Sequence, residues 1–151
     1  MTSSQIAEAI RRESGILQEL LTQLSRAARA LTSEQNETWL TTLRDEFTRF
    51  RAHIHKEMAL QAAGGGFLSE VTDRRPTLSR EAERVENEYA QIVRLADDLH
   101  RSVSSLKLGE RVIIEDVQRR IRFLVDEIGE VQEQRNLLVT LAFSLDIGAA
   151  D

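Results

Sequence analysis

The chain has 151 residues, of which 41% are hydrophobic and 30% charged, and its formal net charge is −5. That length suits a single domain over residues 1–151, and the acidic balance argues against nucleic acid or an anionic membrane as partner, since both need a concentrated basic surface. The lack of cysteine excludes disulfides, thiolate metal sites and thiol nucleophiles. With no apolar run long enough to span a bilayer and no visible signal peptide, we expect a cytoplasmic protein.

Seven glycines and one proline leave few helix breakers, which favours long helices. Four segments carry apolar residues at helical spacing: one that follows Thr2–Ser4 and ends near Leu31, then segments of about 34–62, 78–106 and 110–145. Gly64–Gly66 ends the second segment, and 67–76 reads as a connection with at most a helical turn at 68–71. Short connections between four such helices predict an all-α, up-down-up-down antiparallel four-helix bundle.

Polar residues interrupt these apolar stripes. Ser14 interrupts the first stripe. Tyr89 is the only residue of the third stripe that ends in a polar group, and Arg135 places a charge near the middle of the fourth. In the second, His53 and Glu57 are four residues apart and therefore share one face. At about 100° per residue both point inward, whereas His55 points to solvent. A histidine and a carboxylate directed into a bundle form the type of pair from which metal sites are built.

Six motifs follow one another along almost the whole chain: Glu13-Ser14-x-x-Leu17, His53-x-x-x-Glu57, Gly64–Gly66 with Phe67, Pro76, Glu88-Tyr89, and the tail 142–151. Their order and spacing resemble the hemerythrin-like family of cation-binding four-helix bundles. The resemblance implies a di-iron site inside the bundle, with ligands from all four helices. It also implies binding of dioxygen, redox sensing, or storage or detoxification of metal.

Carried over residue by residue, the resemblance leaves two ligand positions intact, His53 and Glu57. The remaining ligand positions are occupied by other residues, namely Ser14, Tyr89, Val93, Val131 and Arg135 or Asn136. Two ligands from one helix do not hold a di-iron pair, and an arginine would repel the cations.

Arg135 is therefore expected to replace the metal charge rather than accompany it. A buried carboxylate without a cation needs a partner, and a facing arginine supplies charge and several donors. We predict a polar layer in which Glu57 pairs with Arg135, while His53 and Tyr89 complete hydrogen bonds near Ser14. A competing interpretation has the Arg135 side chain reaching out to solvent.

These residues predict a non-catalytic hemerythrin-like domain that has lost its di-iron site and acts as a structural or interaction module. Such a protein is not an enzyme and needs no cofactor; it is a monomer or weak homodimer with a protein partner that the sequence does not identify. The alternative is a bundle that binds iron or a small ligand through a reduced site at His53 and Glu57, in oxygen or redox sensing or metal handling. Nothing in the sequence positions Ser14 and His53 for acyl transfer.

Overall fold

The computed structural model describes residues 3–62 and 67–144, and within these ranges the chain is all-α. Its α-helices are α1 (Ser3–Ala28), α2 (Glu37–Ala62), α3 (Phe67–Arg74), α4 (Ser79–Ser104) and α5 (Arg111–Val139). Short 3₁₀-helical turns precede α2 and α4, and a π-helical turn, Thr140–Ser144, continues α5. None of the described helices is long and apolar enough to cross a membrane.

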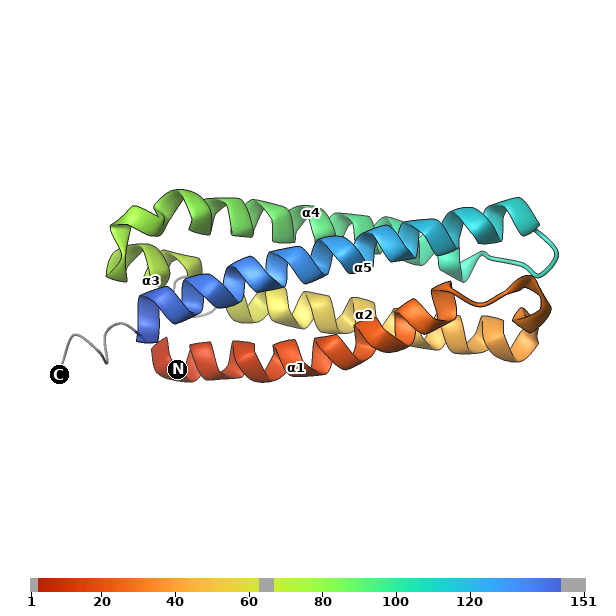
Figure 1. The fold of residues 1–151 in the computed structure, drawn as a ribbon, viewed down its shortest axis with the longest axis horizontal. Coiled ribbons are helices and arrows are strands. Elements are labelled where there is room, and N and C mark those ends of the chain that lie inside the picture. Colours follow the sequence, from red (N-terminus) through yellow and green to blue (C-terminus); the bar gives the residue numbers. More distant parts are fainter. Residues whose placement is uncertain (1–2, 63–66, 145–151) are drawn as a thin grey trace.

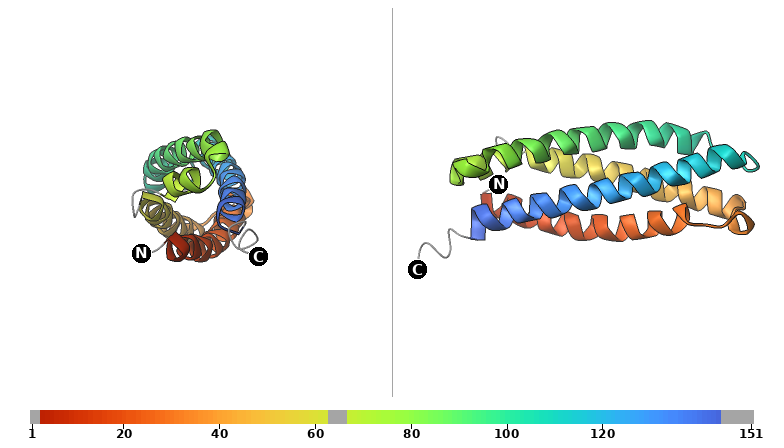
Figure 2. Two further views of the ribbon diagram at one scale, coloured as in Figure 1. Left: turned by 90° about the vertical axis from the view of Figure 1, so that its left-hand side faces the viewer. Right: turned by 45° about the horizontal axis from the view of Figure 1, so that its top comes forward.

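The four long helices lie side by side along one direction, and the chain reverses between each and the next (Figure 1). α1 packs against α2 and α5, and α4 packs against the same two helices. The left view of Figure 2, which looks along the helices, shows the long helices surrounding a shared interior, with α3 lying across one end. Every long helix therefore contributes one face to that interior.

The helix α3 corrects the predicted count of four, because the segment 67–76 was expected to contain at most one helical turn. Leu68 and Val71, three residues apart, are both buried at the end of the core. Their burial stabilises a short amphipathic helix that weak local propensity alone would not hold. A second correction is that α2 begins at Glu37 rather than near 34, because the Asn36 side chain accepts a hydrogen bond of 2.9 Å from Trp39 N and caps the helix.

Buried apolar side chains from all five α-helices form one contiguous core. The inward positions predicted for the second and third segments are buried throughout. Leu31, predicted as the last inward residue of the first helix, is 67% exposed because α1 ends at Ala28. Two carbonyls at this end accept hydrogen bonds from other helices: Ala27 O from Trp39 Nε1 at 3.1 Å, and Ala28 O from Arg122 Nη1 at 3.0 Å.

The turn between α4 and α5 depends on Gly109, whose φ of +89° lies in the left-handed region that favours glycine. The glycine run Gly64–Gly66 and the tail 145–151, which carried part of the hemerythrin-like resemblance, lie outside the described residues.

Candidate functional site

One layer of the core is polar, and each long helix contributes one residue to it. We call Ser14 of α1, Glu57 of α2, Tyr89 of α4 and Arg135 of α5 the buried layer. Arg135 and Tyr89 have no exposed surface, Glu57 is 1% exposed and Ser14 is 8% exposed. All four belong to the residues predicted from the sequence, and the structure brings them together.

Arg135 joins the other three members of the buried layer. Its Nη1 donates to Glu57 Oε2 at 3.2 Å and to Tyr89 Oη at 2.7 Å, and its Nη2 donates to the Ser14 hydroxyl. The predicted ion pair between Glu57 and Arg135 is therefore present. Because the side chain is buried, the competing interpretation in which Arg135 reaches solvent is wrong.

Tyr89 sits between the two charges. Its hydroxyl donates to Glu57 Oε2 at 2.8 Å while it accepts from Arg135. Burial raises the pKa of the Tyr89 phenol far above its ordinary value of 10.0; the nearby Arg135 opposes this rise, and Glu57 adds to it. The phenol is thus a neutral donor at physiological pH. Its ring also lies 5.2 Å from the Arg135 guanidinium carbon, within range of a cation–π contact.

The formal charges of the buried layer cancel, but two of its polar atoms have no hydrogen-bond partner among the described residues. Glu57 Oε2 receives both of the hydrogen bonds described above, while Glu57 Oε1 and Arg135 Nε have no hydrogen-bond partner among the described residues. A buried pair of this type is held by mutual attraction of its charges, so removal of one partner leaves the other charge desolvated and uncompensated.

His53, the fifth predicted residue, is outside this network. Its Nε2 donates to the main-chain carbonyl of Glu13 at 2.9 Å and lies 3.3 Å from Glu13 Oε2. The other carboxylate oxygen of Glu13 is 3.1 Å from Lys56 Nζ. His53 therefore ties α2 to α1 one residue before Ser14 and contacts neither Glu57 nor Tyr89 through these bonds. This corrects the predicted layer: the hydrogen bond from His53 goes to a main-chain carbonyl of α1, and the Glu13 carboxylate, which is also buried, lies beside the ring.

Three further buried polar residues were not predicted from the sequence, namely Gln61, Gln118 and Gln132. Gln132 Oε1 accepts from Gln18 Nε2 at 2.7 Å, and Gln118 Nε2 donates to Ala30 O at 3.0 Å. Gln118 and Gln132 directly follow inward valines on α5, and that adjacency to the stripe is the only sequence signal they carry.

A second polar cluster joins α2 to α4 at the surface. Arg51 Nε and His55 Nε2 donate to the same oxygen of Asp97, at 2.7 and 2.8 Å. We call these three residues the surface clip. The hydrogen bond from His55, and then that from Arg51, lowers the pKa of Asp97 below its ordinary value of 3.8. His55 was predicted to face solvent, and its side chain is 45% exposed.

The residues present do not fit the di-iron pair that the resemblance implies. The positions that would supply ligands hold the Ser14 hydroxyl, the Tyr89 phenol and the Arg135 guanidinium, and the last two donate to Glu57. Val131 adds a buried apolar side chain. The guanidinium nitrogen lies 3.2 Å from the carboxylate, where its charge would repel a metal ion. No group of three or more His, Cys, Asp or Glu residues in the described part of the chain could hold a metal ion.

Comparison of the chain with family models finds no match, and comparisons with curated proteins and with solved structures find none either. The hemerythrin-like resemblance therefore stays a prediction. The function is inferred from the geometry of the chain itself.

Proposed function

We propose that this chain is a metal-free, non-catalytic relative of the hemerythrin-like proteins that acts as a structural or interaction module. In this proposal residues 1–151 form one domain, a cytoplasmic, up-down-up-down antiparallel four-helix bundle with α3 inserted between its second and third long helices. The module binds a partner protein and uses neither nucleic acid, a membrane nor a cofactor.

The buried Arg135–Glu57 ion pair is the observation that supports this proposal most directly. In the resemblance, Glu57 is a carboxylate ligand that faces iron, and here it faces a guanidinium that donates to it at 3.2 Å. The hydrogen bonds from Arg135 to Ser14 and Tyr89 tie the same group to two more helices. A positive charge on a side chain thus neutralises Glu57 and links four helices, which are the two structural tasks that a metal would otherwise perform.

The metal content of the protein tests the proposal. The chain is expressed in iron-supplemented medium, purified without chelator, and analysed by elemental analysis and absorption spectroscopy. We expect iron far below one equivalent and no visible band. Stoichiometric iron with an absorption band that disappears in His53→Ala would contradict the proposal and support the alternative, a reduced iron site at His53 and Glu57.

A variant in which ligand residues are put back adds a test for a gain of metal binding. The triple substitution Ser14→His, Val131→His and Arg135→Glu puts donors at the positions where the resemblance has ligands and removes the competing charge. We expect this variant, checked for helicity by circular dichroism, to bind ferrous or zinc ions that the parent chain does not bind. The matched control Ser14→His with Val131→His keeps Arg135, and we expect it to bind them at least tenfold more weakly.

A further inference from the structure

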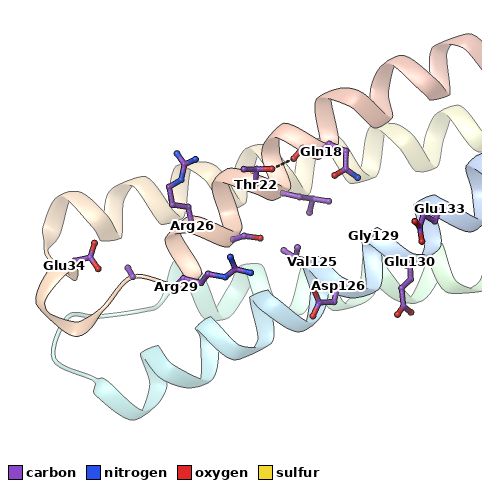
Figure 3. A pocket seen from close by; sticks show the side chains of 13 residues that line it. Gln18, Thr22, Arg26, Arg29, Glu34, Val125, Asp126, Gly129, Glu130 and Glu133 are labelled. Carbon is purple, nitrogen blue, oxygen red and sulfur yellow. Dashed lines mark hydrogen bonds between the residues drawn. The ribbon is translucent and has the colours of Figure 1, made fainter.

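A long groove runs along the outside of the molecule between α1 and α5, with a volume of about 1100 Å³ (Figure 3). On α1 it extends from Gln18 past the end of the helix to Arg29, which at 1.5 Å per residue is roughly 17 Å. Leu21 and Val125 contribute apolar atoms to the lining. The groove is separate from the buried layer, since no residue of that layer lines it.

Gly129 lies in the middle of the α5 side of this groove. Glycine inside a helix is less favourable than alanine because it loses more backbone freedom on folding. The packing of this chain does not require it, because a Cβ placed at Gly129 would meet no atom within 4 Å. The missing side chain therefore keeps space open on the outer side of the helix, where another backbone can approach closely.

The α5 side of the groove is acidic, whereas α1 and the turn that follows it line the groove with both signs, namely Arg26, Arg29 and Glu34. On α5 lie three carboxylates, Asp126, Glu130 and Glu133, at the spacing of one helix face, and none forms an ion pair with a described residue. On the α1 side, Arg29 extends towards α5 at one end (Figure 3). The α5 side is thus acidic over about two helical turns, and Arg29 places a positive charge at one end of the groove.

We propose that this groove binds an amphipathic helix of a partner protein that carries basic residues along one edge. Basic side chains three or four residues apart on that helix would meet the carboxylates of α5, and a small apolar ridge would lie over Gly129. Docking helices usually fill such grooves with residues at this spacing. The inference rests on the proposed function as an interaction module and names the chemistry of its partner.

The end charge also sets a direction for the docked helix. A helix C-terminus carries partial negative charge and unpaired carbonyls, which a guanidinium stabilises. Arg29 lies beyond the C-terminal end of α1. The partner helix therefore runs parallel to α1 and antiparallel to α5, with its C-terminus at Arg29.

A synthetic helix tests the proposal with the full chain. The probe is an alanine-rich peptide of about 18 residues, long enough to be substantially helical, with arginines at positions i, i+4 and i+7 and a free C-terminal carboxylate. A second peptide carries glutamates in place of the arginines. Amide NMR titration at low ionic strength should show saturable shifts at Gly129 and its neighbours with the basic peptide, and at least tenfold weaker binding of the acidic one.

Two groove variants and two matched controls locate the binding. Gly129→Leu puts a side chain into the open space, where its Cβ would meet no atom within 4 Å, and we expect it to weaken binding of the basic peptide at least tenfold. Glu130→Lys with Glu133→Lys should reverse the preference towards the acidic peptide. Gly15→Leu, at another helical glycine with open space that does not line the groove, and Glu115→Lys, an exposed charge at the start of α5, should leave binding within twofold.

Several results would overturn this inference. They are no saturable shift at Gly129, equal affinity in Gly129→Leu, or no preference for the basic peptide. Concentration-dependent shifts of the groove without peptide would assign it instead to a second copy of the chain. Iron analysis of the same samples is a separate readout: iron-loaded protein contradicts the proposed function whether or not the peptide binds, and a metal-free protein that ignores the peptide contradicts only this inference.

Discussion

The buried layer and the surface clip make the same connection in different surroundings. Both join α2 to α4 through a carboxylate, and their shortest hydrogen bonds to it are alike, 2.8 Å for Tyr89–Glu57 and 2.7 Å for Arg51–Asp97. The layer is closed to water, with Arg135 and Glu57 at most 1% exposed, whereas the Arg51 and Asp97 side chains are 41% and 30% exposed. Water therefore screens the clip and not the layer, so bond length alone does not rank the two.

Loss of one charge from the buried layer should have the largest effect. Arg135→Met removes the guanidinium but fills a similar volume, and it leaves the Glu57 carboxylate buried and unpaired. We expect the free energy of unfolding at pH 7 to fall by about 3–5 kcal/mol. Urea unfolding followed by circular dichroism measures this. In the matched surface variant Arg51→Met the free energy of unfolding should fall by no more than about 1 kcal/mol. Equal losses in the two variants would show that burial does not distinguish the layer from the clip.

Removal of both buried charges should reverse most of that loss. Met at both 57 and 135 leaves neither ion desolvated, and replacement of a buried pair by apolar residues is often neutral or stabilising by about 1–4 kcal/mol. We expect the double variant to be at least as stable as the parent chain in the same urea experiment. A double variant no more stable than Arg135→Met alone would mean that the layer contributes mainly through its hydrogen bonds.

Tyr89→Phe should have an intermediate effect. It keeps the ring but removes the hydroxyl that donates to Glu57 and accepts from Arg135. A charged, buried acceptor then loses one of its donors, and we expect a loss of about 1–3 kcal/mol. Thermal unfolding measures it, and a change within 0.5 kcal/mol, of the order seen for ordinary surface substitutions, would show that Arg135 alone satisfies Glu57.

The surface clip should show the smallest effect, and it should depend on pH. Because the folded pKa of Asp97 lies below 3.8, its contribution is present above that pH and disappears as the pH falls through the folded value. Asp97→Asn should therefore lower stability at pH 7 by at most about 1 kcal/mol, and the difference from the parent chain should vanish in strong acid. Unfolding midpoints between pH 2 and 7 measure this; a constant difference would exclude the ionisation of Asp97 as its cause.

Much of the fold was accessible from the apolar spacing alone. Residues at steps of three and four must share a helix face, and the positions predicted to point inward on α2 and α4 are buried. The same reasoning placed Ser14, Glu57, Tyr89 and Arg135 on inward faces. The α3 helix escaped it, because Leu68 and Val71 give too short a pattern until they are seen to fit the end of the core.

What the sequence determined by itself is therefore which residues point inward and that their charges must be matched. A buried carboxylate on one stripe and a buried guanidinium on another leave few alternatives to pairing. Only the tertiary structure decided which partner His53 takes, that Glu13 is buried, and that a groove opens at Gly129. Those outcomes depend on the rotation and separation of whole helices, which are set by the packing of all the faces at once and are not encoded in any one stripe.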